Sequence, residues 1–558
     1  MMRIIIARLA AALLSLTAIA AHANVSLRNG NFFMSYTDAV ATGGLEMKVE
    51  RIFNSKASGK SIFGAGWGFN YGSYLQVLGD GRVVIHEYGT GADNVFSPVE
   101  NSVARTETMA SMQDRLTQAA TRSGAFGSNG DVAAFRKLVL NEEKENEQSD
   151  QLIAIGLLDA VPGAPEGSVF YSGRFSAQTV TRVREGYERQ NGSQFEAYDQ
   201  HGRLQRIWDR NHNFIALHYD GRGRLVETVD NQGDVFTFAY NAQGYVESIT
   251  DQLGRKAVYE YSGDDLVRST DVEGNIYDHK YDDVHNMTEI DYSDKTLVKI
   301  VYYGANNDYS VKSYTDRDGT VTEYTYRSDS DRDGSGERTE TVTVDVHGDD
   351  GASISHSSYN YFFKTVSGLE FQARLVTTID NDVTDTTYNS DGLPMVIIHN
   401  GAVTKFTYDS LGHVVHKEEA DGTVTDLTYD QRVNKVASVV IRQGSEARRS
   451  DFTYDDKGNL LTAANSDGTS VRLTYDDNGH IAVLADNHDH ILNFAYNRIG
   501  KPIRIELVGV GTINVAYDAE GKIMKVDSDR GRTIAVQVTS LFQELLDIIR
   551  PAGVTLSF

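Results

Sequence analysis

The chain has 558 residues, enough for several domains' worth of buried core, and it contains no cysteine. Disulfide frameworks and thiolate metal sites are therefore excluded. Its formal charge of −25 opposes binding to phosphate backbones, so we expect no nucleic-acid partner.

Residues 1–23 have the features of a Sec-type signal peptide. Arg3 and Arg8 form a positively charged start, residues 9–20 an apolar stretch, and Ala21-His22-Ala23 a small-residue cleavage site. The stretch is too short to span a bilayer, and no later segment reaches about 18 apolar residues. We therefore expect an exported protein, periplasmic, cell-surface or extracellular, without a transmembrane segment. Removing the peptide, with two arginines and no acidic residue, changes the formal charge from −25 to −27.

Residues 24–100 are predicted to form a β segment. Its glycines let aromatic side chains pack against bare backbone, and we expect Phe63 and Trp67 to be core residues rather than a ligand cage.

The pattern changes to helical spacing in residues 101–165. One predicted helix carries Met109, Met112, Leu116 and Ala120; a second carries Val132, Phe135, Leu138 and Val139, with Asp131 as its cap. This helical insertion either caps the fold or docks a partner, or it is a surface decoration.

A motif of tyrosine, aspartate or asparagine, and glycine then repeats from Tyr198 to Gly521. The tyrosines at 198, 219, 240 and 261 are 21 positions apart, as are those at 454, 475, 496 and 517. Self-similarity at a fixed period of this size indicates stacked supersecondary units.

Each repeat is predicted to be two strands and two turns. Phe236, Phe238 and Tyr240 alternate with more polar residues, which is the period of a strand. The Asp-x-x-Gly that follows is turn chemistry, since aspartate bonds its own backbone and glycine accepts a positive φ. Joined end to end, such hairpins form one long antiparallel sheet, which must coil or close because of its twist.

These units, such as Tyr219-Asp220-Gly221-Arg222-Gly223-Arg224-Leu225, resemble the YD repeats of RHS proteins. That class includes the shell-forming C components of insecticidal toxin complexes. Residues 24–100 resemble the N-terminal segment of the same family, through Gly30-Asn31-Phe32-Phe33, residues 49–55 and Phe63-Gly64-Ala65-Gly66-Trp67. The resemblance implies an all-β fold: a long antiparallel sheet of hairpins over residues 166–532, wound into a spiral shell around a cavity.

One stretch between Tyr302 and Tyr388, where the repeat pattern loosens, has the spacing of a calcium loop. Residues 329–340 fit Asp-x-Asp-x-Asp-Gly-x5-Glu, with these candidate ligands: Asp329, Asp331, Asp333, Ser335, Glu337 and Glu340. The flanks are predicted strands rather than the helices of an EF-hand, so the alternative is an acidic hairpin tip without an ion. Calcium is the only cofactor that we expect.

No catalytic arrangement is apparent, so we do not expect an enzyme. His488-Asp489-His490 could be read as metal ligands, but it occupies the second turn of a repeat, and we interpret it as a solvated turn.

Residues 533–558 form the tail after the repeats. They contain a predicted short helix, capped by Thr539 or Ser540 and ended by Pro551. Its apolar face, formed by Leu541, Phe542, Leu545, Leu546 and Ile549, is too wide for a free surface helix. The helix either plugs the shell's own lumen or docks another chain. Family members that carry a toxin end in an Asp-Pro-x-Gly type of signature, of which Arg550-Pro551-Ala552-Gly553 is a weak echo, so self-cleavage and an in-chain toxin are not expected.

Three functions follow as hypotheses. The chain is an exported scaffold of a toxin or effector type of system, whose β shell encapsulates or docks a separately encoded protein partner. Alternatively, it is a cell-surface or periplasmic protein that binds carbohydrate through exposed tyrosines and aspartates, or a structural protein of the envelope.

Overall fold

The computed structural model describes residues 22–549, except residues 42, 58, 79–80, 90, 99–108, 123–125, 127, 140–163, 173–177, 330–336, 367–368, 499, 519–522 and 530–531. Most of the signal peptide predicted for residues 1–23 therefore lies outside the described residues. The chain divides into two compact units: a larger unit of Met1–Asn70 with Trp208–Phe558, and a smaller unit of Tyr71–Ile207. The predicted segments 24–100 and 166–532 each cross a border between these units. No helix among the described residues is long and apolar enough to cross a membrane.

The smaller unit is an antiparallel sheet in which each strand pairs with the next along the chain, from β7 to β13. Its elements are β7 Tyr74–Val77, β8 Val83–His86, η1 Glu87–Gly89, β9 Asp93–Ser97, α2 Met109–Arg122, α3 Asn129–Leu138, β10 Val169–Ser172, β11 Gln178–Val183, β12 Gly186–Asn191 and β13 Gln194–Asp199. Strand β14, Leu204–Asp209, crosses the border to the larger unit.

The turn after β13 lies directly against the backbone of β7. Leu75 donates its N–H to the carbonyl oxygen of Gly202 at 2.8 Å. Gly202 has φ +78°, and a Cβ there would lie 1.8 Å from the carbonyl oxygen of Leu75. Only glycine fits this position without moving the strand.

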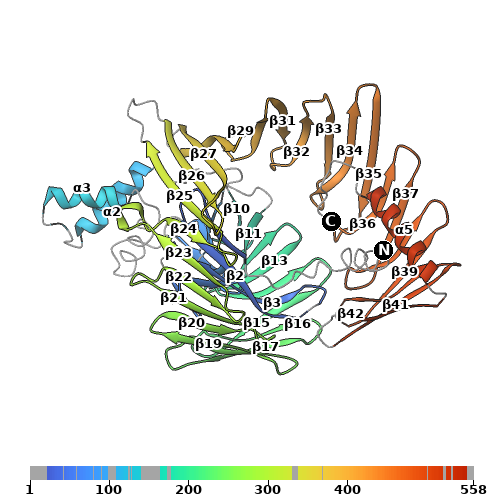
Figure 1. Ribbon diagram of the computed structural model, residues 1–558, viewed down its shortest axis with the longest axis horizontal. Helices are drawn as coiled ribbons and strands as arrows, with labels where there is room; N and C mark the ends of the chain where they lie inside the picture. Colours follow the sequence, from blue (N-terminus) through green and yellow to red (C-terminus); the bar gives the residue numbers. More distant parts are fainter. Residues whose placement is uncertain are drawn as a thin grey trace. The chain divides into compact units, whose positions relative to one another are not determined.

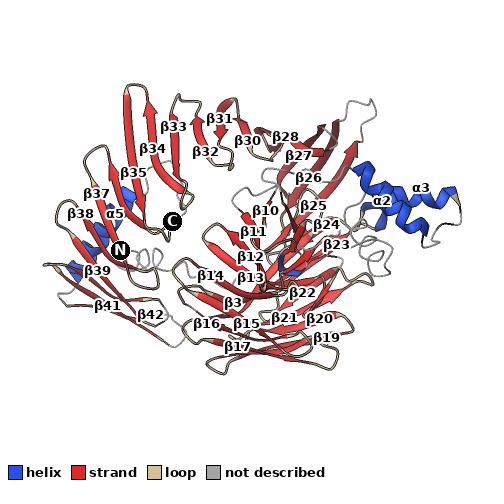
Figure 2. Ribbon diagram, turned by 180° about the vertical axis from the view of Figure 1, so that it is seen from behind, coloured by secondary structure: helices blue, strands red, loops and turns tan. Residues whose placement is uncertain are grey.

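Both helices predicted in the insertion are present as α2 and α3 (Figure 2). Their small core contains Leu116, Ala119, Ala120 and Val139. The predicted cap is wrong: the cap of α3 is Ser128, whose hydroxyl accepts a bond from the N–H of Asp131. Asp131 in turn accepts from the N–H of Ser128 at 2.8 Å, so it is the third helical residue of a capping box.

The larger unit begins with a small sheet in the order β1-β2-β3-β6, with β4 and β5 paired beside it. These strands are β1 His22–Val25, β2 Phe32–Ala41, β3 Met47–Asn54, β4 Lys60–Ser61, β5 Gly64–Ala65 and β6 Trp67–Phe69. We call residues 32–69 the N-terminal segment.

The rest of the larger unit is one antiparallel run of hairpins, visible in chain order in Figure 1. Its strands are β15 Phe214–Tyr219, β16 Leu225–Asp230, β17 Val235–Tyr240, β18 Val246–Asp251, β19 Lys256–Ser262, β20 Asp265–Thr270, β21 Ile276–Tyr281, β22 Met287–Tyr292, β23 Leu297–Tyr302, β24 Val311–Thr315, β25 Val321–Asp329, β26 Glu337–His347, β27 Ser353–Val366, β28 Leu369–Ile379, β29 Asp382–Tyr388, β30 Pro394–His399, β31 Ala402–Tyr408, β32 Val414–Glu418, β33 Val424–Asp430, β34 Lys435–Gln443, β35 Glu446–Tyr454, β36 Leu460–Asn465, β37 Ser470–Tyr475, β38 Ile481–Asp486, β39 Ile491–Tyr496, β40 Pro502–Leu507, β41 Gly511–Tyr517 and β42 Ile523–Ser528. The 3₁₀ turn η2 is Ala305–Asn307, and α5, Arg532–Ile549, ends the described chain.

The predicted all-β fold of antiparallel hairpins is confirmed. Each repeat is two strands, as in β17 and β18, and the register shifts at the repeat tyrosine. The pairing of β37 with β38 shows the same register shift, between Thr474 and Tyr475. The tyrosine stays paired, and the extra residue of the bulge, Glu247 or Ala482, is on the following strand. A bulge of this kind increases the local twist.

One face of the sheet carries the core, and we call it the core face. The register places Tyr259, Tyr277, Ile300, Ile397 and Leu473 on it. Because side chains alternate between faces, residues on this face recur at every second position.

Two parts of the chain cover the core face at different places. The N-terminal segment packs over β19–β24, where Tyr36 contacts Tyr277 with ring centroids 4.5 Å apart and Phe63 contacts Tyr259 at 5.2 Å. Helix α5 packs over the late strands β36, β37, β41 and β42, and its Leu545 belongs to the same buried core as Leu473. Phe63 and Trp67 are fully buried, as predicted.

Between these places, no described helix or N-terminal strand packs extensively on β28–β32. The core-face side chains Leu375, Ile397 and Phe406 are consequently only half-buried. We call this part of the sheet the open stretch.

The hairpin run of the larger unit also contacts itself across a long separation in sequence. Asn211, in the turn after β14, exchanges side-chain hydrogen bonds with Asn459 at 3.2 and 2.9 Å. Asn213 donates to the carbonyl oxygen of Asn478 at 2.9 Å. We call these contacts between early and late turns the seam.

The C-terminal helix is present, but its predicted start is wrong. Helix α5 begins at Arg532, so Thr539 and Ser540 lie inside it rather than at its cap. The apolar spacing that begins at Ile534 and includes Val538 already belongs to the helix, and Val538 is buried in the same core as Leu545.

Candidate functional site

The repeat tyrosine connects each hairpin to the preceding one. The hydroxyl of Tyr475 donates a hydrogen bond to the carbonyl oxygen of Leu460 at 2.8 Å. The same bond, to the residue 15 positions earlier, is made by Tyr240, Tyr261, Tyr281, Tyr302, Tyr429, Tyr496 and Tyr517. Burial raises the pKa of these hydroxyls, which keeps them protonated as donors.

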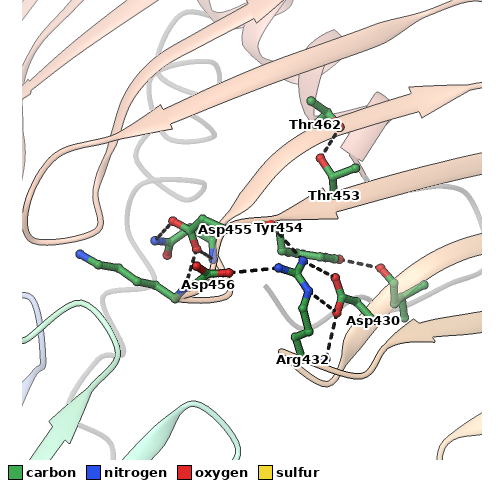
Figure 3. A network of polar contacts seen from close by, with 10 residues as sticks. Asp430, Arg432, Thr453, Tyr454, Asp455, Asp456 and Thr462 are labelled. Atoms are coloured by element: carbon green, nitrogen blue, oxygen red, sulfur yellow. Dashed lines mark hydrogen bonds and ion pairs between the residues drawn. The ribbon is translucent and has the colours of Figure 1, made fainter.

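The repeat aspartate holds the turn that follows. The Oδ1 atom of Asp455 accepts backbone N–H bonds from Lys457 at 2.9 Å and Asn459 at 2.8 Å (Figure 3). This is an Asx-type turn, which aspartate forms with its own backbone. In the same view, the exposed Arg432 bonds both Asp430 and Asp456, so it links two neighbouring turns.

The residue four positions after the aspartate, position +4, completes the turn. Its side chain donates to Oδ2 of the aspartate in the turns closed by Arg203, Asn213, Arg224, Arg255, Asn275, Asn286, His413, Asn459, His480 and His490. His490 belongs to this set and His488 is exposed beside it, so the predicted turn at 488–490 is confirmed.

Position +4 also reaches the tyrosine of the next repeat. Arg224 lies over the ring of Tyr240 with its Cζ 4.6 Å from the centroid, and His480 stacks on Tyr496 at 4.7 Å. The contact of Arg224 is a cation–π interaction, which contributes about 0.5–1 kcal/mol when it is partly exposed. The tyrosine, the aspartate and position +4 therefore all bond within the sheet. They build the sheet rather than offering a row of free recognition groups.

A buried ion pair within the N-terminal segment, between Asp38 of β2 and Arg51 of β3, bonds two residues of the core face. Arg51 is fully buried and donates to Oδ1 of Asp38 at 2.9 Å and to Ser269 at 3.0 Å, and Tyr259 donates to Oδ2 of Asp38 at 2.7 Å. The Arg51 guanidinium also lies 4.8 Å from the ring centroid of Trp67. Burial alone would lower the pKa of Arg51, but the Asp38 carboxylate raises it, so the guanidinium stays protonated.

His279 lies beside this pair and is held neutral. Its Nε2 is 3.3 Å from the hydroxyl of Tyr36. Burial, reinforced by the positive charge of Arg51, lowers the pKa of His279 to about 3. A neutral ring in an aromatic cluster suits packing and gives no sign of acid–base chemistry at neutral pH.

Three of the predicted calcium ligands lie within the described residues. Asp329 ends β25, while Glu337 and Glu340 are on β26, which pairs antiparallel with β25. Each already forms an ion pair: Asp329 with Arg327, Glu337 with Lys364, and Glu340 with Arg338. Asp331, Asp333 and Ser335 lie outside the described residues, so calcium binding by this loop stays a prediction.

The predicted docking residues of α5 face the sheet. Leu541, Leu545 and Ile549 are buried in the core with the late strands, and Phe542 packs at 6.0 Å from Phe494. The side chain of Leu546 lies outside the described residues. Docking of another chain by these residues stays a prediction, and it would require α5 to leave the sheet.

Sequence reasoning missed the buried pair of Arg51 and Asp38. A signal was present, because Met47, Val49, Arg51 and Phe53 alternate on one face of β3 and all are buried. A basic residue inside such an apolar series indicates a buried partner.

Comparisons with known families match three parts of this architecture. The RHS Repeat family matches residues 198–235 and 219–256, and the Teneurin YD-shell family matches residues 369–485. The chain is an RHS/YD-repeat protein. A domain of unknown function (DUF6531) matches residues 23–96, which include the N-terminal segment.

Similar solved structures cover most of this YD-repeat chain at low identity. A TccC3 variant of the Photorhabdus luminescens Tc holotoxin pore is 10% identical over 90% of this chain, with a TM-score of 0.39. The crystal structure of TcdB2-TccC3 is 11% identical over 90%, with a TM-score of 0.38. This chain spans 29% and 30% of those chains' own length. Sequence identities and TM-scores this low give no basis for assigning a function to this chain. No curated protein matches the chain.

Proposed function

We propose that this YD-repeat protein is an exported scaffold whose sheet encloses or docks a separately encoded polypeptide. The observation that carries the proposal is the open stretch. On this part of the core face, Leu375, Ile397 and Phe406 are half-buried. On both sides of it, the same face is covered by other parts of the chain.

An extended or helical polypeptide segment is the occupant that best fits this surface. Helix α5 already shows how the core face accepts an apolar helix, because Leu541, Leu545 and Ile549 fill it over the late strands. Apolar surface of this kind contributes roughly 25 cal/mol per Å² when a partner covers it. The partner is therefore expected to carry an apolar segment.

The carbohydrate-binding alternative relies on free tyrosines and aspartates in the repeats. The hydroxyl of Tyr475 and the carboxylate of Asp455 are instead bonded within the sheet, as are their equivalents in the other described repeats. A purely structural role in the envelope remains the second candidate, since it needs no ligand. Export itself rests on residues 1–23, and N-terminal sequencing of the mature protein would test it by finding cleavage after Ala23.

The test is native mass spectrometry of the tagged protein purified gently from its own host. We expect a second polypeptide in fixed stoichiometry. Ile397→Asp should abolish it, because a buried carboxylate opposes apolar contact. Ile398→Asp is the matched control: it is the next residue of β30, equally half-buried, and it points to the opposite face.

If the unaltered protein is detected only as a single chain, without a second polypeptide, the result would contradict the proposal and favour the structural role. Equal loss of the second polypeptide in both variants would show that the open stretch does not select the partner. Deletion of residues 101–165 would then test whether the insertion does so.

A further inference from the structure

The turn after β16 has a carboxylate at position +4. In this turn the residue four positions after Asp230 is Asp234, which places a carboxylate where the ten turns named above have arginine, asparagine or histidine. Some other turns, such as those at Asn241 and Asp316, have Tyr245 and Thr320 at this position. Oδ1 of Asp230 still accepts backbone bonds from Gln232 and Asp234, both at 2.9 Å. Its Oδ2 has no donor. The missing donor leaves Oδ2 of Asp230 without a partner, near the carboxylate of Asp234.

Further oxygen atoms without partners surround this turn. Oδ2 of Asp234, Oδ1 of Asn213 and the side-chain amide of Gln232 also lack hydrogen-bond partners. Asp230, Asp234 and Asn213 are only 4%, 2% and 1% exposed, so water outside the protein cannot satisfy them. A buried polar atom without a partner costs about 1–3 kcal/mol, and more when it is charged.

Three of these oxygens, from Asp230, Gln232 and Asn213, lie beside the backbone of Gly43 and Gly44, in the loop between β2 and β3. A Cβ on Gly43 would lie 3.1 Å from Oδ2 of Asp230 and 3.2 Å from Oε1 of Gln232. A Cβ on Gly44 would lie 2.0 Å from Oδ1 of Asn213. The side chain of Asn213 is fixed in this orientation, because its Nδ2 donates to Asp209 at 2.8 Å and to the carbonyl of Asn478 at 2.9 Å.

The charges at this place are not balanced. Arg498 donates to Oδ1 of Asp234 at 3.0 Å and to the carbonyl oxygen of Gln232 at 2.9 Å, but no donor reaches Asp230 Oδ2. Burial raises the pKa of Asp230, and the neighbouring Asp234 carboxylate adds to the effect. Two buried carboxylates with one arginine leave a negative charge that a further cation would neutralise.

We propose that Asp230, Asp234, Asn213 and Gln232 bind a calcium ion. The available ligands are carboxylate and amide oxygens, which suit hard cations rather than the metals that prefer nitrogen or sulfur. Magnesium keeps several waters, which a site this buried does not favour, whereas calcium accepts six to eight oxygens in irregular geometry. The site is distinct from the acidic loop at residues 329–340.

This site differs in composition from a cluster of charged ligands. The described residues contain no group of three or more histidine, cysteine, aspartate and glutamate side chains placed to hold a metal. The candidate ligands here are two carboxylates and, in addition, two side-chain amide oxygens. All four groups have an oxygen without a hydrogen-bond partner. The ion would connect the loop at Gly43, the turn at Asn213 and the turn at Asp230, next to the seam.

The test is calorimetric titration of chelator-treated full-length protein with calcium chloride, paired with thermal unfolding. All proteins carry Asp331→Ala, so that the acidic loop contributes nothing. We expect one calcium ion per chain and an unfolding temperature that rises with calcium but far less with equal magnesium. A ligand that binds only the folded state must raise stability in this way.

Two variants remove the site by different routes. Asp234→Asn supplies the donor seen at Asn275 in an otherwise similar turn, so the fold should persist while calcium affinity falls at least tenfold. Gly43→Ala keeps both carboxylates and places a methyl group among the ligand oxygens, and it should also weaken binding. Asp283→Asn removes an exposed turn carboxylate and should leave binding unchanged.

Absence of both the heat and the thermal shift in the parent protein would overturn the proposal, as would unchanged binding in Asp234→Asn. A protein that ignores calcium but gains stability on acidification would show that Asp230 holds a proton instead.

Discussion

The buried pair of Arg51 and Asp38 makes the clearest quantitative prediction. Asp38→Asn removes the charge that faces Arg51, whose side chain is 0% exposed, and it weakens the acceptor used by Tyr259. Breaking a buried ion pair from one side costs about 3–5 kcal/mol, because the remaining charge is left uncompensated. We therefore expect Asp38→Asn to lower the free energy of unfolding of the larger unit by about that amount.

Urea unfolding followed by tryptophan fluorescence suits this measurement. Trp67 lies 4.8 Å from the Arg51 guanidinium and reports on the site directly. The chain has two tryptophans, so the series is best made with Trp208→Phe to isolate the Trp67 signal.

The pair of Arg268 and Asp278 is a matched control. It is also bidentate, at 2.6 and 3.0 Å, but its side chains are 47% and 37% exposed. Asp278→Asn should cost less than about 1 kcal/mol. Equal midpoints for Asp38→Asn and Asp278→Asn would refute the view that the buried ion pair stabilises the larger unit. The double variant Asp38→Asn/Arg51→Met should regain much of the lost free energy of unfolding, because it buries no charge without a partner.

Three further predictions test other features. Gly202→Ala should destabilise the smaller unit clearly more than Gly192→Ala, measured by thermal unfolding. Both glycines have positive φ, worth about 1–2 kcal/mol, but only a side chain at Gly202 would also collide with the backbone of Leu75. His279→Gln should flatten the pH dependence of stability between about pH 6.5 and pH 3. The ring binds a proton more readily when unfolded than in the fold, where its pKa is about 3, so the parent protein loses stability as the pH falls through this window. Asp331→Ala, compared with the parent protein in calcium calorimetry, should remove one binding event; an unchanged titration would show that the acidic loop is only a turn.

Local structure was largely predictable from the sequence. The strands and turns follow from alternation around residues such as Phe238 and from the aspartate and glycine of each turn, because both signals act over a few positions. The boundaries of the helices were less predictable. Ser128 and Asp131 both have the chemistry of a cap, and only the backbone geometry distinguishes them.

Long-range contacts could not be predicted, because the repeats resemble one another locally. Nothing near Asn211 indicates that it meets Asn459 rather than a neighbouring turn. The open stretch is equally hidden, since Ile397 has the same alternation as residues that α5 covers. The Asp230 site had a readable signal, namely a carboxylate at position +4, but its meaning required the donors of the other turns to be known.

The repeat bonds have a consequence for how such a chain changes length over evolution. Each tyrosine hydroxyl reaches back 15 residues, and position +4 stacks on a tyrosine one repeat ahead, so every bond of the pattern spans less than one period of 21 residues. Gain or loss of a whole repeat would leave these bonds intact, as in other proteins built from nearest-neighbour units. The seam would not survive it, because Asn211 and Asn459 face each other only at one separation. The hydrogen bonds between neighbouring repeats are therefore compatible with any number of repeats, whereas the seam can form only with one number of repeats between Asn211 and Asn459.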